Sequence, residues 1–140
     1  MKSLSKRQIW LVRRSFGKIA ARPEVIARGF YGHLFTHHPE VRPLFRHDMT
    51  IQGQKLMEML AILLTELDNP AYLQKVCGEL GVRHQRYGVT AEHFTAVRAA
   101  LIWALEQYLG GDFTPSVREA WAALYDAVTD MVLNPVVGES

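Results

Sequence analysis

Apolar residues recur along this chain at intervals of three and four, the spacing that lines one face of an α-helix. The pattern repeats in six segments, each bounded by glycine, proline or a helix-capping residue. No run alternates apolar and polar residues between hairpin turns, as a half-buried strand would. The sequence therefore predicts an all-α protein. The positions expected to face inward are Ile9, Val12, Phe16, Ile19, Ile26, Phe30, Leu34, Phe35, Leu56, Leu60, Leu63, Leu67, Leu73, Val76, Leu80, Phe94, Val97, Leu101, Leu105, Tyr108, Val117, Trp121, Leu124, Val128 and Met131.

Capping signals place the helix ends. Ser5 and Gln8 form a capping box at the start of the first segment, and Leu4 and Ile9 are placed as the hydrophobic staple beside it. The proline-rich segment 39–45 is predicted to form a tight helical corner. We expect about six or seven helices in all. The later helices should begin at Pro23, near Thr50, at Asn69-Pro70, at Thr90 and at Thr114-Pro115, with breaks at Gly88 and Gly110-Gly111.

Length and composition exclude several classes of protein. The 140 residues fit a single domain over 1–140, with 49% apolar and 21% charged residues. A net charge of +2 without a basic block gives no support for nucleic-acid binding. The apolar stretch 59–64 is too short to cross a bilayer, and no secretion signal follows the basic start. Cys77, the only cysteine, cannot form an internal disulfide, which fits a reducing compartment. We expect a cytoplasmic protein with no membrane or nucleic-acid partner, and the sequence leaves its oligomeric state open.

Three polar residues lie on helix faces that are otherwise apolar. His84 continues the stripe that ends at Leu80, Gln52 shares a face with Leu56, and Tyr31 lies among the apolar positions of the second helix. Each has an ordinary explanation: a satisfied core histidine, a glutamine bonded to free N–H groups at a helix start, and a core tyrosine bonded to the backbone. Taken singly these explanations are favoured, but together the three groups are harder to dismiss. No phosphate-binding loop, paired-cysteine site, nucleophile elbow or His-Glu-x-x-His pattern accompanies them, so hydrolytic and phosphoryl-transfer chemistry lacks support.

Two stretches of the chain resemble a known family. Residues 29–45, Gly-Phe-Tyr-Gly-His-Leu-Phe-Thr-His-His-Pro-Glu-Val-Arg-Pro-Leu-Phe, are similar to the second helix and corner of flavohaemoglobin-type globins. Residues 82–89, Val-Arg-His-Gln-Arg-Tyr-Gly-Val, resemble the end of the haem-binding helix of the same family. The likeness runs from Ser5 to Met131, and the order and separation of its motifs are specific. It implies a globin fold around a haem pocket, of the single-domain bacterial type.

The resemblance implies a role for each matching residue. His84 matches the proximal ligand of the haem iron, and its Nδ1–H is expected to donate to a carbonyl one turn back, such as that of Leu80. Tyr31 and Gln52 match the distal pair that acts on the gas ligand, and Phe45 matches the phenylalanine that packs on the porphyrin. The other matching positions are Lys55 near a haem propionate, Leu56 beyond the distal glutamine, and Val89, Phe94 and Val97 along the proximal and rear walls. For Lys55 the alternative is a solvated side chain, and for the apolar positions it is simple core packing.

The same resemblance implies a function. The cofactor is expected to be haem b, and the ligands oxygen, nitric oxide and carbon monoxide. Two aimed donors hold oxygen tightly, which favours nitric oxide dioxygenation and detoxification over oxygen transport. An external reductase is expected because no flavin and nicotinamide domains follow in these residues. Phe94 replaces a tyrosine common in flavohaemoglobins, which lowers the expectation of peroxidase-like chemistry, and His47 is a lesser candidate for the haem edge.

Three alternatives stay open at this point. The chain could bind haem only to store oxygen, or to signal gas binding to a partner without turnover. It could also be a helical interaction domain without haem. An absorption spectrum of the purified protein separates the last from the others.

Overall fold

The computed structural model describes residues 4–45, 48–86 and 88–133, except for the side chains at positions 84–86. This part of the chain contains helices and no strand, which confirms the all-α prediction. The helices are α1 (Lys6–Ile19), α2 (Pro23–His37), the 3-10 helix η1 (Pro39–Leu44), α3 (Met49–Thr65), α4 (Pro70–Arg86), α5 (Ala91–Leu109), the 3-10 helix η2 (Gly110–Asp112) and α6 (Pro115–Leu133).

The predicted capping signals form at the helix starts. Ser5 accepts from the backbone N–H of Gln8 at 3.0 Å while the Gln8 side chain accepts from the backbone N–H of Ser5, so the capping box is complete. Thr90 and His93 make a second box at the start of α5, with the His93 ring in place of the usual carboxamide. Asp48 caps α3 by accepting from the backbone N–H of Thr50 at 2.6 Å, an acceptor that the sequence analysis did not single out. These side chains satisfy N–H groups that a helix start leaves free.

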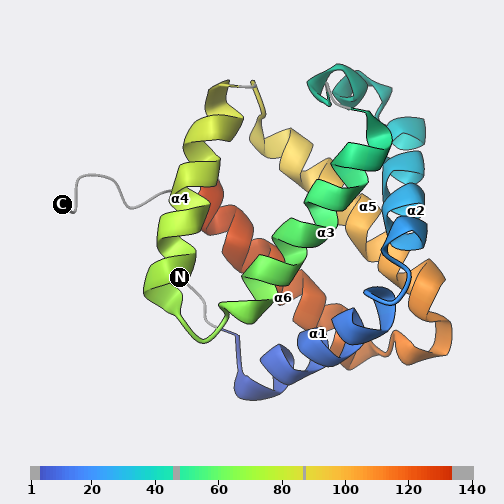
Figure 1. Ribbon diagram of the computed structural model, residues 1–140, viewed down its shortest axis with the longest axis vertical. Coiled ribbons are helices and arrows are strands. Elements are labelled where there is room, and N and C mark those ends of the chain that lie inside the picture. Colours follow the sequence, from blue (N-terminus) through green and yellow to red (C-terminus); the bar gives the residue numbers. More distant parts are fainter. Residues whose placement is uncertain (1–3, 46–47, 87, 134–140) are drawn as a thin grey trace.

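The helices pack around an apolar core that falls into two clusters. The larger cluster joins α1, α2, α3, α5 and α6, and the smaller joins the last turn of α3, the first two thirds of α4 and the end of α6. Within the described residues α4 packs extensively only on α6, and Figure 1 shows α4 along one side of the molecule with α6 behind it. Helix α6 is therefore the main link between α4 and the rest of the fold.

One buried polar contact ties α1 to α6 inside the larger cluster. The indole N–H of Trp121, which is 1% exposed, donates to the Ser15 hydroxyl at 2.8 Å. The hydroxyl donates in turn to the carbonyl of Leu11 at 2.8 Å, so both buried groups are satisfied.

We expect Ser15→Ala to lower the free energy of unfolding by about 1–3 kcal/mol, because it leaves the buried Trp121 N–H without an acceptor. Urea unfolding followed by circular dichroism measures this loss. Thr65→Ala is the matched control, since Thr65 makes the same kind of bond to the carbonyl of Ala61 at 2.8 Å on an exposed surface. Equal losses in the two variants would contradict the assignment.

Candidate functional site

Tyr31 and Gln52 meet where α2 crosses α3. Tyr31 is buried at 8% exposure on α2, and its hydroxyl donates to the main-chain carbonyl of Gln52 at 3.3 Å. Gln52 lies in the first turn of α3 and is half-buried. The two helices approach closely there, because a β-carbon at Gly53 would lie 3.0 Å from that of Ala27. The structure thus brings the predicted pair together. The Tyr31 hydroxyl nevertheless bonds to the backbone, as expected if Tyr31 is an ordinary core tyrosine.

Burial sets the electrostatics of this pair. Removal from water raises the pKa of Tyr31 above its ordinary value of 10.0, and a hydrogen bond with the Gln52 side chain offsets part of that rise. A buried phenol resists ionisation because its charged form loses hydration. Tyr31 is therefore a neutral hydrogen-bond donor at physiological pH.

Aromatic side chains surround the Tyr31 ring. Phe45, at the end of η1, meets it edge-on with ring centroids 5.4 Å apart, and Phe35 stacks on it at 5.7 Å. Phe35 also contacts Phe45, at 5.5 Å. Edge-to-face and offset pairs of this kind stabilise aromatic clusters. Phe35 was expected only in the core. Its position four residues after Tyr31 on one helix was the signal that the two rings touch.

The predicted apolar lining is not gathered in one place but divided between the two core clusters. Leu56, one turn beyond Gln52, and Val97 on α5 are half-buried against the larger cluster. Phe94 is half-buried against the smaller cluster beside α4, and Val89 is half-buried in the turn before α5. Lys55 is exposed, which agrees with a solvated side chain.

His84 lies in α4, but its side chain is outside the described part of the structure. Its role as an iron ligand, and the bond from its ring to the Leu80 carbonyl, therefore stay predictions. The same holds for His47, which falls outside the described residues altogether.

Tyr125 is a residue near the predicted proximal wall that the sequence analysis missed. Its hydroxyl donates from α6 to the main-chain carbonyl of Phe94 at 2.5 Å, and burial strongly raises its pKa. The contact holds the first turn of α5 onto α6. Its position four residues after Trp121, on the inward face of the last helix, was the signal available in the sequence.

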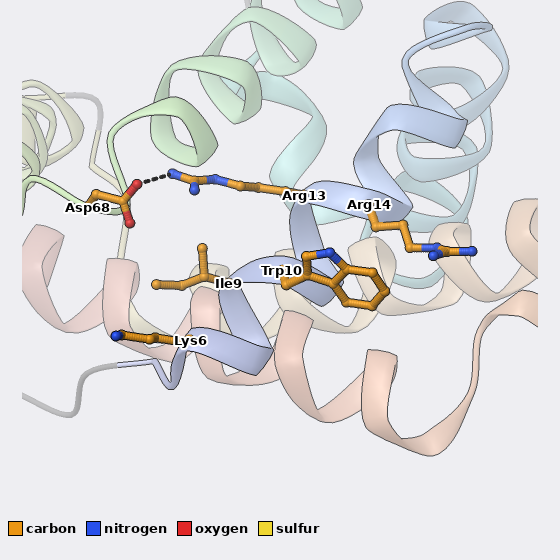
Figure 2. A pocket seen from close by; sticks show the side chains of 6 residues that line it. All are labelled: Lys6, Ile9, Trp10, Arg13, Arg14 and Asp68. Carbon is orange, nitrogen blue, oxygen red and sulfur yellow. Dashed lines mark hydrogen bonds and ion pairs between the residues drawn. The ribbon is translucent and has the colours of Figure 1, made fainter.

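Open grooves in the described part of the chain lie away from these residues. One, of about 570 Å³, runs along α1 and is crossed by an ion pair between Arg13 and Asp68 at 3.1 Å (Figure 2). Beside it the exposed Trp10 ring faces the guanidinium of Arg14 at 5.1 Å. Another, of about 470 Å³, lies beside His33 and α5. Neither groove is lined by a serine, threonine or cysteine that could serve as a nucleophile.

The described residues show neither a cluster of metal-binding side chains nor a membrane-spanning helix. No three His, Cys, Asp or Glu side chains there are grouped so that they could hold a metal ion. No helix in this part is long and apolar enough to cross a membrane.

The raised pKa of Tyr31 predicts that its hydroxyl ionises at a higher pH than that of an ordinary tyrosine. Because the neutral phenol is favoured in the folded state, its contribution to stability is present below pH 10.0 and is lost as the pH rises through the folded-state pKa. In alkaline spectrophotometric titration, the ionisation that Tyr31→Phe removes should lie above pH 10.0, with Tyr72→Phe as a control for an exposed tyrosine. A Tyr31 step at or below that pH would argue against the buried donor.

Comparison with known proteins identifies relatives of this chain. The chain is 28% identical over 134 residues to a flavohemoprotein of Deinococcus radiodurans and 30% identical over 134 residues to one of Rhodopirellula baltica. Each alignment covers 94% of this chain but 33% of the relative, so the chain spans about a third of the length of these curated relatives.

A solved structure shows the same fold. It is an engineered carbene transferase built on a proposed nitric oxide dioxygenase of Rhodothermus marinus, 31% identical, with a TM-score of 0.82. The superposition covers 93% of this chain and 91% of that one. The sequence profile of the Globin family matches residues 28–132, which contain the Tyr31–Gln52 contact, the α4 helix and most of α6. The chain belongs to the globin family and has the globin fold.

Proposed function

We propose that this globin binds haem b and holds oxygen tightly enough for nitric oxide dioxygenation, with electrons from a separate reductase. The observation that carries the proposal is the contact of the buried Tyr31 hydroxyl with Gln52, beside Phe45. Location in the cytoplasm and turnover as an enzyme are parts of the same proposal. So is the finer likeness to the single-domain protein known as Hell's Gate globin, which rests on residues 54–57 and 108–110.

The residues present fit a haem. Half-buried apolar side chains pack against each of the two core clusters, and these could supply the apolar walls that a porphyrin needs on its faces. Two polar side chains come from the α2–α3 side, and position 84 comes from α4, which packs on α6. An iron here would be held mainly by the nitrogen ligands that the porphyrin brings.

A bound haem would supply the iron that takes up a diatomic gas, and the distal residues would select among gases. Tyr31 is neutral and buried, so its O–H is a donor in a region of low dielectric constant, where a hydrogen bond to a partly charged ligand is strengthened. Gln52 contributes an amide with two N–H donors. Donors of this kind favour a gas that carries partial negative charge, such as oxygen, over neutral carbon monoxide.

The Tyr31 hydroxyl has one proton, so it can donate to a ligand only by giving up the Gln52 carbonyl. At 3.3 Å that bond is longer than the usual O–H···O distance of about 2.7–2.8 Å, and its exchange costs little. The present contact therefore holds the hydroxyl beside Gln52 and leaves its proton available for donation to a ligand. We infer that Gln52 positions Tyr31 as well as acting as a donor itself.

The relatives support the dioxygenase part of the proposal. The curated relatives are named flavohemoproteins, and the structural neighbour is built on a proposed nitric oxide dioxygenase. The alignment covers 33% of the Deinococcus radiodurans flavohemoprotein, and an electron donor from another polypeptide is a further part of the proposal.

The first test is pigment binding. Purified protein reconstituted with haem should show a Soret band and a five- or six-coordinate spectrum that depends on His84. His84→Ala should weaken haem retention about tenfold or more, because it removes the axial ligand. His37→Ala, an exposed histidine on α2, is the control. An unchanged Soret band and haem-loss rate in His84→Ala would refute the assigned ligand.

The second test is gas chemistry. Tyr31→Phe should release oxygen faster by about one to two orders of magnitude, as expected for the loss of a donor contributing about 1–3 kcal/mol, while carbon monoxide release changes less. Stopped-flow mixing of the oxygenated protein with nitric oxide should give nitrate within the mixing time. Tyr108→Phe, a half-buried tyrosine on α5, is the control. Slow nitrate formation with unchanged oxygen release in Tyr31→Phe would leave only storage or sensing.

A further inference from the structure

Gly81 lies at the point where α4 comes closest to α6. It is buried, and a β-carbon there would overlap the carbonyl oxygen of Val132 and lie 3.2 Å from its carbonyl carbon. These are backbone atoms of a helix and cannot turn aside as the end of a flexible side chain could. By contrast, a β-carbon at Gly17 or Gly32 would meet nothing within 4 Å. The approach of the two backbones at Gly81 therefore requires glycine.

The neighbouring side chains show that this approach continues along α4. Cys77, one turn earlier, is 0% exposed, and Leu80 is 6% exposed. Both pack in the smaller core cluster with Met131 and Val132 of α6. Small residues at 77 and 81 thus face the end of α6, where a larger side chain would force the helices apart.

Within the described part of the chain, no second helix braces α4 from another direction to the same extent. Among the described residues α6 is the one helix packed extensively on α4, although Leu63 of α3 joins the smaller cluster. A displacement at Gly81 is therefore not absorbed by a second helix. It passes to the end of α4, where position 84 follows three residues later.

We propose that Gly81 is a positioning residue for the proximal side of the pocket. By letting α4 lie directly on the α6 backbone, it fixes the distance between position 84 and the Tyr31–Gln52 pair on the opposite side. The inference rests on the proposed role of His84. It goes beyond that role by assigning the placement of the ligand to a contact between two backbones.

The size of the effect follows from the geometry. A methyl group at position 81 must move α4 off α6 by on the order of 1 Å, since packed interiors have no room to accept it. Displacements on that scale are large for a group that must meet a metal at one distance and angle. The axial bond should therefore weaken even where the fold survives.

The test compares Gly81→Ala with Leu73→Ala. Leu73 is 6% exposed in the same α4–α6 cluster, and its truncation leaves a cavity without pushing the helices apart. Thermal unfolding of the two apoproteins measures how much stability each variant loses. Haem transfer to excess apomyoglobin gives the rate of haem loss, and resonance Raman spectroscopy gives the iron–histidine stretching band.

Gly81→Ala should lose haem about ten- to a hundredfold faster than wild type and move the iron–histidine band. Leu73→Ala should leave the band in place, even if its stability falls by as much. Gly32→Ala, which adds a methyl group to open space on α2, should change neither. Equal effects in Gly81→Ala and Leu73→Ala, or an unmoved band in Gly81→Ala, would overturn the proposal.

Cys77→Leu provides a second route if Gly81→Ala does not fold. It overfills the same interface one turn earlier and should move the band in the same direction, and an unmoved band in a folded Cys77→Leu protein counts against the proposal. Failure of the proposed function is visible separately, because wild type would then show no iron–histidine band or would keep it in His84→Ala.

Discussion

Helix α6 runs through both parts of the apolar core, and the candidate site depends on this shared helix. Its first half carries Trp121 and Leu124 into the larger cluster, and its end carries Met131 and Val132 into the smaller one. The distal residues belong to helices packed in the larger cluster, whereas position 84 belongs to α4, which packs on the end of α6. The separation between α4 and the Tyr31–Gln52 pair is thus set largely through one helix. A change in either cluster is expected to alter that separation.

The helix crossing on the distal side works by a similar rule. Small residues, Ala27 on α2 and Gly53 on α3, allow the two backbones to come close, and this closeness brings the Tyr31 hydroxyl to Gln52. Gly81 does the same where α4 meets α6. Both helix contacts therefore depend on residues that have little or no side chain. Dense interiors transmit such constraints because there is no free volume to absorb a shift.

Much of the fold could be predicted from the sequence because its signals are local. The Ser5–Gln8 box, the Thr90 cap and the proline-rich corner each depend on residues within a few positions of one another, and the structure contains all of them. The sequence was less informative about helix caps where neighbouring residues allowed more than one interpretation. Asp48 was not singled out as the cap of α3, and the ring of His93 stands in the second box where glutamate or glutamine is usual.

The site was less predictable because it depends on contacts between helices. Periodicity puts Tyr31 and Gln52 on inward faces, but only the crossing of α2 and α3 decides that they meet. Their pairing came from the family resemblance and not from spacing. Tyr125 escaped for the same reason, since its bond to the Phe94 carbonyl joins positions 31 residues apart.

The long bond from Tyr31 to Gln52 suits the proposed site, in which the hydroxyl would exchange partners. A short bond from Tyr31 to a buried acceptor would hold the phenol proton against any incoming ligand, whereas an unpaired hydroxyl would be costly to bury. The 3.3 Å bond to the Gln52 carbonyl lies between these extremes. When the proton turns to a ligand, that carbonyl keeps its second lone pair and any bond within α3, so it is not left wholly unsatisfied. If the pair acts as proposed, the cost of exchange is small compared with the gain from a partly charged ligand in a region of low dielectric constant, and burial of Tyr31, more than any formal charge, would make the pair selective.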